Sequence, residues 1–329
     1  IVIAALAPFL GAIADRGSAK KKFLIFFCYM GMVMTGGLYM VGQGQWQMAV
    51  MVYIAASVGF MGANIFYDSF LPSVASKEKM NYVSSLGFAL GYIGGGLLFL
   101  INVLMYLHPQ WFGIADAATA IKLSFLSVAV WWGIFTIPLL LFVPEPQISD
   151  SLPLVRAISA GYRQLRITFT QIRQLKIIGM FLLAYWLYID GVDTIIRMSV
   201  KMGSSLGFEA GDLITALLMV QFIAFPAALG YNWFASKIGT KKAVLIAIGG
   251  YSVVTLLAYF MTVKLHFYIL AALIGLFQGG VQALSRSLFT RLIPRGKEAE
   301  FFGFYNMLGK FAAVIGPIMM GWVTLATGN

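Results

Sequence analysis

The sequence has little of what soluble enzymes and metal-binding proteins use. Its 329 residues include one cysteine, Cys28, and two histidines, His108 and His266. A single cysteine excludes an internal disulfide framework and a metal site built from cysteines, and we expect neither a metal nor a cofactor. Only 11% of the residues are charged, against about a quarter in a typical soluble domain. No Gly-x-x-x-x-Gly-Lys-Ser/Thr string occurs, which excludes a phosphate-binding loop and primary pumping by this chain.

Apolar residues dominate instead. They make up 60% of the chain, and the mean hydropathy is +0.86. This composition excludes a soluble enzyme, a disordered chain and a nucleic-acid-binding protein. The net charge of +11 then reflects loops rich in Lys and Arg on the cytoplasmic side of a membrane. We therefore predict an all-α, multi-pass membrane protein without enzymatic activity.

Membrane spans can be counted because a helix needs about 20 apolar residues to cross a bilayer. Ten apolar runs are candidates: residues 1–14, 23–42, 48–70, 86–107, 121–142, 177–200, 213–233, 243–263, 267–288 and 302–325. The first run is too short to span, and the chain begins with Ile. A truncated span is therefore preferred over a signal peptide, which would need a basic flank before the run. If the loop at 15–22 is cytoplasmic, loops on that side hold 17 of the 23 basic residues and the opposite loops hold four, which fixes the orientation.

The longest polar stretch, 144–176, separates two groups of five runs. After Pro153, apolar residues recur at 158, 162, 165, 169 and 172, with four arginines off that stripe. The pattern predicts a basic amphipathic helix. It either lies on the membrane surface or forms a solvated linker.

The two groups also resemble each other. Residues 11–21 (GAIADRGSAKK) are echoed by 235–242 (ASKIGTKK), and 87–96 by 312–321. Parallel repeats of this kind are typical of major facilitator transporters. We predict an N-terminal half bundle at 1–143, a cytoplasmic linker at 144–176 and a C-terminal half bundle at 177–329. The repeat also implies ten of twelve expected transmembrane helices, with the first and the last absent from this chain.

One signature and a set of four further runs carry a family resemblance. Residues 11–21 resemble the major facilitator signature between the second and third spans, which implies that Asp15 and Arg16 form a charge relay at a cytoplasmic gate. The runs 279–287 (GGVQALSRS), 300–306 (EFFGFYN), 64–72 (NIFYDSFLP) and 190–194 (DGVDT) resemble the autophagy-type vacuolar amino-acid effluxers and their bacterial relatives. That resemblance implies secondary transport, with amino-acid efflux as the activity known in fungi.

Charged groups inside a span cost about 2.5–3.5 kcal/mol each at the helix centre, so each needs a reason. Asp190, Asp193 and Arg197 share one face of the predicted sixth span. A buried acid beside a second acid is suited to proton coupling. Alternatively, Asp193 and Arg197 form a structural ion pair at i, i+4.

Further polar residues recur on the faces of other spans. Lys310 is too deep to reach water easily, so we expect it either to pair with Asp190 or Asp68 or to anchor a substrate carboxylate. Arg286 either gates or snorkels to the cytoplasmic interface. The predicted substrate or proton cavity also includes Gln278, Gln282 and Asn306, and the predicted cytoplasmic gate also includes Asn64 and Asp68.

Together these observations predict a secondary transporter that works by alternating access. The resemblance points to export or exchange of amino acids or similar small polar solutes, with protons as a further partner, by a monomer in a bacterial cell membrane. The alternative is a non-transporting sensor or lipid-handling scaffold on the same fold. The intramembrane charges argue against a scaffold, which has little reason to retain their cost.

Overall fold

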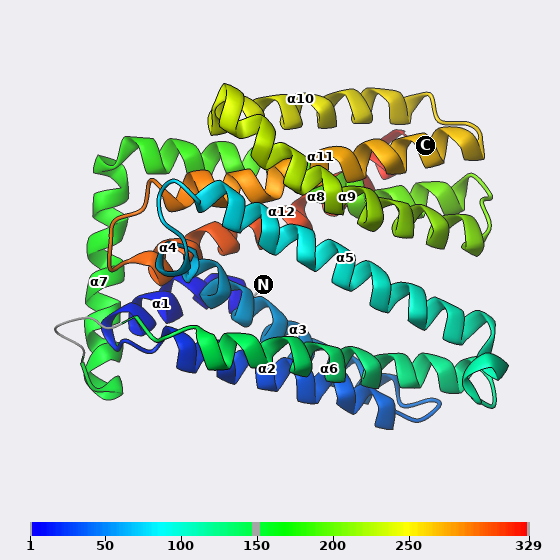
Figure 1. Ribbon diagram of the computed structural model, residues 1–329, viewed down its shortest axis with the longest axis horizontal. Helices are drawn as coiled ribbons and strands as arrows, with labels where there is room; N and C mark the ends of the chain where they lie inside the picture. The colour runs from blue at the N-terminus through cyan, green and yellow to red at the C-terminus, as the bar shows by residue number, and fades with distance from the viewer. Residues whose placement is uncertain (1, 147–151, 328–329) are drawn as a thin grey trace. The chain divides into compact units, whose positions relative to one another are not determined.

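The computed structural model describes residues 2–146 and 152–327, and the regular structure in these ranges is helical (Figure 1). The chain forms two compact units. The first unit comprises Ile1–Val74, Leu97–Phe169 and Pro294–Asn306, and the second comprises Ala75–Gly96, Thr170–Ile293 and Met307–Asn329. Two long helices, α5 (Met80–Leu107) and α12 (Glu298–Thr327), each contribute to both units. Division of the chain into halves at the 144–176 linker stays a prediction.

In the first unit, α2 packs against α3 and α6 around a core of phenylalanines. Phe66 stacks on Phe23 and Phe27, with ring centroids 5.2 and 6.0 Å apart. Close approach of α2 and α3 depends on Gly59, where a Cβ would clash with the backbone of Gly31, and a Cβ on Gly31 would clash with the ring of Trp132 on α6. The unit contains α1 (Val2–Arg16), α2 (Lys20–Gly37), η1 (Leu38–Met40), α3 (Trp46–Ser69), α4 (Leu71–Val74), η2 (Pro109–Phe112), α6 (Ala117–Phe142), most of α7 (Leu154–Gln174) and parts of α5 and α12.

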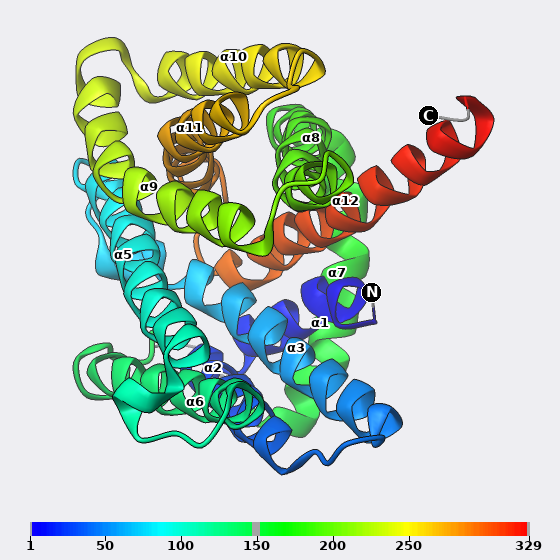
Figure 2. The same cartoon turned by 90° about the vertical axis from the view of Figure 1, so that its right-hand side faces the viewer.

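In the second unit, α11 (Lys264–Thr290) packs against α9 (Ala210–Ile238) and α10 (Thr240–Tyr259), an arrangement visible in Figure 2. Small residues allow this packing: a Cβ on Gly279 would press on Ala228, and one on Gly280 on the ring of Tyr231. The remaining elements are α8 (Lys176–Ser205) and the adjoining parts of α5 and α12. Helix α11 is therefore buried on most of its faces.

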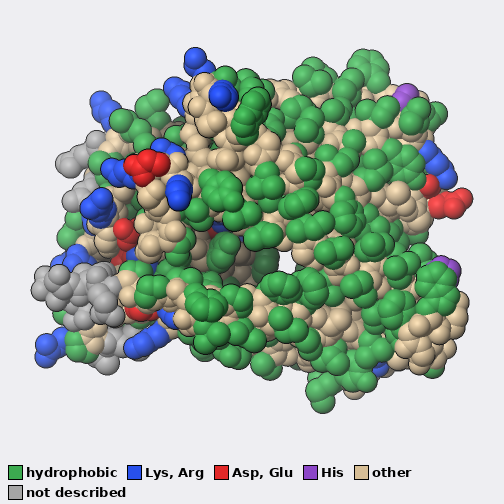
Figure 3. Space-filling model, in the orientation of Figure 1, with side chains coloured by type: hydrophobic (Ala, Val, Ile, Leu, Met, Phe, Trp, Pro, Cys, Tyr) green, Lys and Arg blue, Asp and Glu red, His purple; other side chains and the backbone are tan. Residues whose placement is uncertain are grey.

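Within the described ranges, nine helices are long and apolar enough to cross a membrane: α2 with η1, α3, α5, α6, α8, α9, α10, α11 and α12. They coincide with nine of the ten predicted runs. The first predicted run forms α1, whose 15 residues are short for a span. Figure 3 shows hydrophobic side chains over most of the visible surface and basic side chains gathered at the left of the view. The protein is an integral, multi-pass membrane protein.

Helix α7 begins directly after Pro153, as the sequence predicts, because proline tolerates the position before a helix but not its interior. Ala157, Gln164 and Thr168, which lie off the predicted apolar stripe, are buried, whereas Ile158 and Tyr162 of the stripe are exposed. The side chains of residues 169 and 172, also part of that stripe, lie outside the described structure. Whether α7 lies on the membrane surface or forms a solvated linker stays a prediction.

Candidate functional site

The interior of the second unit holds polar atoms that have no hydrogen-bond partner among the described residues. They come from four helices and are Ser85 Oγ, Trp186 Nε1, Asp190 Oδ1, Thr194 Oγ1, Tyr251 OH and Gln278 Oε1. Buried polar groups in native proteins are normally paired, since leaving one unpaired costs about 1–3 kcal/mol. Tyr251 interacts electrostatically with Tyr92 and Asp193, which places α5, α8 and α10 around a shared polar region. We call these six atoms and their residues the unpaired polar set.

Asp193 lies close enough to Lys310 and to Arg197 for an electrostatic interaction with each, and the interaction with Lys310 is the larger. No ion pair within 4.0 Å joins it to either of them in the described structure. The predicted i, i+4 ion pair of Asp193 and Arg197 is therefore not formed, and Arg197 is exposed. Asp193 is an acid within electrostatic reach of Lys310, and the predicted pairing of Lys310 with Asp190 or Asp68 stays a prediction. The structure thus brings two acids of α8 and a lysine of α12 into one unit.

Helices α5 and α11 meet along a hydrogen-bonded line that we call the Arg286 cluster. The guanidinium of Arg286 donates to Ser84 Oγ at 3.0 Å and to the Ser84 carbonyl at 2.9 Å, and it lies 4.4 Å from the ring centroid of Phe88. Ser287 donates to Asn81 at 2.6 Å, and Tyr92 donates to Gln282 at 2.6 Å.

Arg286 is only 5% exposed, so the prediction that it could snorkel to the interface is wrong. Ser84 and Phe88, four residues apart on α5, hold it inside the second unit instead.

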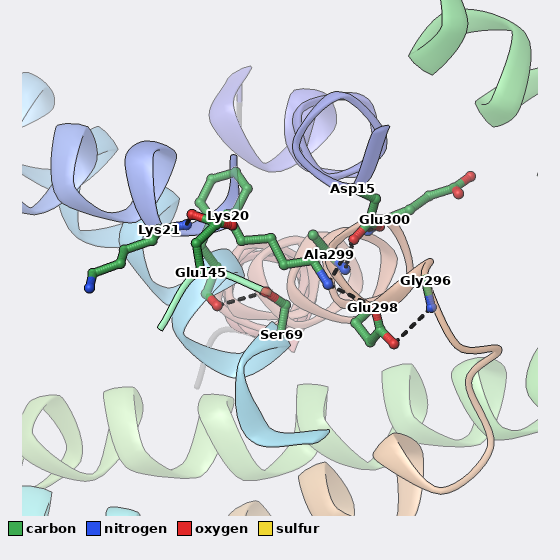
Figure 4. Close-up of polar contacts among 10 residues, drawn as sticks. Asp15, Lys20, Lys21, Ser69, Glu145, Gly296, Glu298, Ala299 and Glu300 are labelled. Carbon is green, nitrogen blue, oxygen red and sulfur yellow. Dashed lines mark hydrogen bonds and ion pairs between the residues drawn. The ribbon is translucent and has the colours of Figure 1, made fainter. Parts of the chain in front are cut away.

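A second polar cluster lies in the first unit, where α1 meets the start of α12 (Figure 4). Asp15 accepts hydrogen bonds from the backbone N–H groups of Ala299 at 3.2 Å and Glu300 at 2.8 Å. Lys20 forms ion pairs with Asp15 at 3.0 Å and Glu298 at 2.7 Å. The free N–H groups of the first helical turn and the helix dipole favour a carboxylate here. We call these five residues the Asp15 cluster.

Burial dominates the electrostatics of Asp15, which is 3% exposed. Desolvation raises the pKa of Asp15 to about 6, although Lys20 and the Glu300 N–H oppose the shift. The cation that pairs with Asp15 is Lys20, and the charge relay of Asp15 and Arg16 that the family signature implies stays a prediction. Arg16 instead donates to Gln164 of α7.

Two further predicted gate residues lie on α3. Asn306 of α12 donates to Asp68 at 3.1 Å, and Asn64 lies one turn before Asp68, partly buried. Asn306 therefore groups with the first unit and the predicted gate, not with the cavity residues of the second unit. Sequence reasoning missed Lys20, Glu298 and Gln164, because nothing in the local pattern links positions so far apart.

A cavity of about 70 Å³ lies among α8, α9, α10 and α11. Its lining is apolar, including Val220, Val254 and Ile274, and it contains none of the predicted site residues. The hydroxyl of Ser199, which also lines it, is bonded to the Ile195 carbonyl. This cavity therefore offers no groups for binding a polar solute.

Comparison with known proteins identifies the family. The whole chain, residues 1–329, matches the family described as "Vacuole effluxer Atg22 like". The chain belongs to this family. The uncharacterized MFS-type transporter YxiO of Bacillus subtilis is 40% identical over 100% of this chain and 76% of its own length. Autophagy-related protein 22 of Yarrowia lipolytica is 23% identical over 96% of this chain and 67% of its own length.

Solved structures show the fold of this Atg22-like chain. The major facilitator superfamily proton:xylose symporter XylE matches with a TM-score of 0.69 and 13% identity, over 98% of this chain and 79% of that chain. The predicted major facilitator fold is thereby confirmed. The chain is a secondary transporter of this superfamily. Its similarity to a protein of Bacillus subtilis is consistent with a location in a bacterial membrane. Relatives of this superfamily bind small-molecule substrates.

Proposed function

We propose that this Atg22-like transporter exports or exchanges amino acids or similar small polar solutes, coupled to protons, by alternating access. The unpaired polar set carries the proposal. Six buried polar atoms without partners are unfavourable in a membrane-embedded bundle, and a bound polar solute would satisfy them. The family description names an effluxer, which agrees with transport of a soluble compound.

The charges of the second unit suit a zwitterion. Asp190 and Asp193 supply carboxylates for an ammonium group or a proton, and Lys310 and Arg197 supply cations for a carboxylate. Gln278 and Gln282 of α11 lie one turn apart and add amide groups. Gln282 is already bonded to Tyr92, which leaves Gln278 as the glutamine with an unpartnered oxygen.

Asp15, Arg16, Asn64, Asp68 and Arg286 form the cytoplasmic gate in this proposal. The Asp15 cluster joins α1 to α12, and the Arg286 cluster joins α5 to α11. Both clusters therefore join a helix of the predicted N-terminal half to one of the predicted C-terminal half, each within a single compact unit. Alternating access requires such contacts to break and re-form, and hydrogen bonds and ion pairs can do so without loss of a packed core.

Transport assays test the proposal. Protein reconstituted in liposomes with an imposed proton gradient should move radiolabelled neutral amino acids, and Asp190→Asn should reduce gradient-driven flux to background. Asp116→Asn is the matched control: Asp116 caps α6 through Thr119 N–H at 2.7 Å, and Asn caps a helix equally well. If Asp190→Asn leaves the flux unchanged, Asp190 does not couple transport to protons.

Absence of flux for every amino acid, from protein shown to be folded, would contradict the proposed substrate. It would favour the alternative function, a membrane sensor or a lipid-handling scaffold. Binding of an amino acid to the folded protein without flux would distinguish a sensor from a scaffold.

A further inference from the structure

Helix α7 has three distinct faces, and one of them fixes its position. Gln164 accepts from Arg16 of α1, and Gly161 lies so close to Ile13 that a Cβ would press on it. Thr168 is fully buried and accepts a hydrogen bond from Gln164 at 3.3 Å. This buried face holds α7 against α1 in the first unit, and Figure 1 shows α7 at the left of the view, running crosswise to α2 and α6.

The position places α7 at the cytoplasmic boundary of the membrane. It covers the end of α1, next to the Asp15–Lys22 turn that the distribution of basic residues assigns to the cytoplasmic side. A helix that lies at this boundary and runs crosswise to the membrane-spanning helices lies along the plane of the bilayer, at the depth of the lipid headgroups.

The second face of α7 is apolar and exposed. Ile158 is 46% exposed and Tyr162 is 67% exposed, one helical turn apart. An aromatic ring with a polar tip is the side chain most typical of the membrane–water interface.

The third face carries charges of one sign only. Arg156, Arg163 and Arg166 are all exposed, and the 21 residues of α7 include four arginines and no acidic residue. An exposed helix surface normally carries both signs of charge. A surface with arginines beside exposed apolar residues is complementary to phosphate groups above an acyl layer.

We propose that α7 is a docking surface for anionic phospholipids of the cytoplasmic leaflet. The guanidinium groups of Arg156, Arg163 and Arg166 pair with the headgroup phosphates, and Ile158 and Tyr162 enter the interface. Each arginine near an anionic leaflet strengthens association by roughly fivefold. The occupant is a lipid and not free phosphate, because a soluble ion would leave the exposed apolar face, Ile158 and Tyr162, in contact with water.

Lipid quenching tests this inference in the intact chain. A fluorophore is attached at Ser159→Cys, an exposed position on α7, in a Cys28→Ala background. The labelled protein is placed in vesicles of phosphatidylcholine or of equal parts phosphatidylcholine and phosphatidylglycerol, with one of the two lipids brominated. The relative binding constant of phosphatidylglycerol over phosphatidylcholine is then measured from the quenching.

We expect phosphatidylglycerol to be preferred, and the combined substitution Arg156→Gln, Arg163→Gln and Arg166→Gln to reduce the preference at least about tenfold. The matched control replaces Lys237, Lys241 and Lys242 by Gln. These three lysines are exposed and are predicted to lie on the same side of the membrane. Their replacement lowers the net charge by the same amount as the triple arginine substitution but leaves α7 unchanged. The preference for phosphatidylglycerol should therefore persist in this control.

Equal loss of preference in both variants, or no preference in the unmodified protein, would overturn the proposal. Displacement of phosphatidylglycerol by inorganic phosphate, but not by chloride at matched ionic strength, would overturn the choice of a lipid as the occupant. Both variants are checked for monodisperse elution, so that misfolding does not mimic loss of binding.

Discussion

At the scale of single residues, the Asp15 cluster shows how a carboxylate is accommodated almost without water. Two backbone N–H groups and the Lys20 ammonium contact Asp15, and Lys20 in turn contacts Glu298. Breaking a buried ion pair costs about 3–5 kcal/mol, because the remaining charge is left unpaired. Removing either Asp15 or Lys20 alone is therefore unfavourable, although burial of the charged carboxylate itself opposes assembly of the cluster.

The raised pKa of Asp15 makes this cluster sensitive to pH. In the assembled cluster the pKa is about 6, against 3.8 for the unperturbed group. Because the assembled state has the higher pKa, the contribution of Asp15 to assembly is complete below pH 3.8 and is lost as the pH rises through about 6. Lowering the pH from 7 to 5 should increase the equilibrium constant for assembly, the ratio of assembled to separated cluster, by roughly tenfold.

Pulsed electron paramagnetic resonance can measure this fraction. Spin labels at Lys22→Cys and Arg295→Cys, both exposed, report whether the start of α12 is docked. The dependence on pH should disappear in Asp15→Asn. The same pH dependence in that variant would assign the titration to another group.

Sequence reasoning reached part of this cluster and not the rest. Asp15 was predicted because a local signature surrounds it. Lys20 and Glu298 are 278 residues apart, and only the folded chain pairs them. In the unpaired polar set, Trp186 and Thr194 lie one helical turn before and after Asp190. Helical periodicity could therefore have identified them as site residues, whereas no spacing in the sequence links Tyr251 of α10 to Asp190.

At the scale of elements, contact between α1 and α12 depends on two glycines, Gly11 and Gly303, which have no side chain at the contact. A Cβ on Gly11 would clash with the carbonyl oxygen of Ala299, and one on Gly303 would meet the backbone of Ala7. Backbone atoms cannot move aside as a flexible side chain can. These two glycines therefore set how closely the helices approach, and with it the hydrogen bonds of the Asp15 cluster.

Gly11→Ala should accordingly separate α1 from the start of α12 and weaken their contact by about 1–3 kcal/mol. Hydrogen exchange at the backbone amides of Ala299 and Glu300 should become faster. Gly91→Ala on α5 is the control, since a Cβ there meets nothing within 4 Å and Ala favours helix over Gly. Unchanged exchange in Gly11→Ala would show that the contact tolerates an added methyl group.

The existence and order of the long helices could be predicted from apolar runs alone, because the bilayer requires continuous apolar segments. Their ends could not: α5 begins at Met80 rather than 86, and α8 extends to Ser205 rather than 200. Polar residues continue helices beyond the apolar layer. The buried face of α7 also escaped prediction, because Ala157, Gly161, Gln164 and Thr168 are not apolar enough to form a visible stripe.

At the scale of the whole molecule, the distribution of charge predicts a topology that can be measured. Lys201 and Lys264 belong to the four basic residues of the predicted outer loops, whereas Lys77 and Lys237 belong to the predicted cytoplasmic set. All four are exposed. A membrane-impermeant amine reagent should modify the outer pair in right-side-out vesicles and the cytoplasmic pair only in inverted vesicles. Modification of Lys77 from the outside would contradict the assigned orientation.

The Asp15 cluster also has a consequence for biosynthesis. The acceptor Asp15 and the donor N–H of Glu300 are 285 residues apart, so translation at about 5–20 residues per second separates them by roughly 15–60 s. During that interval Lys20, only five residues away, is already available to the carboxylate. We therefore expect the ion pair between neighbours in sequence to be able to form during synthesis, and the rest of the Asp15 cluster only after residue 300 has been made.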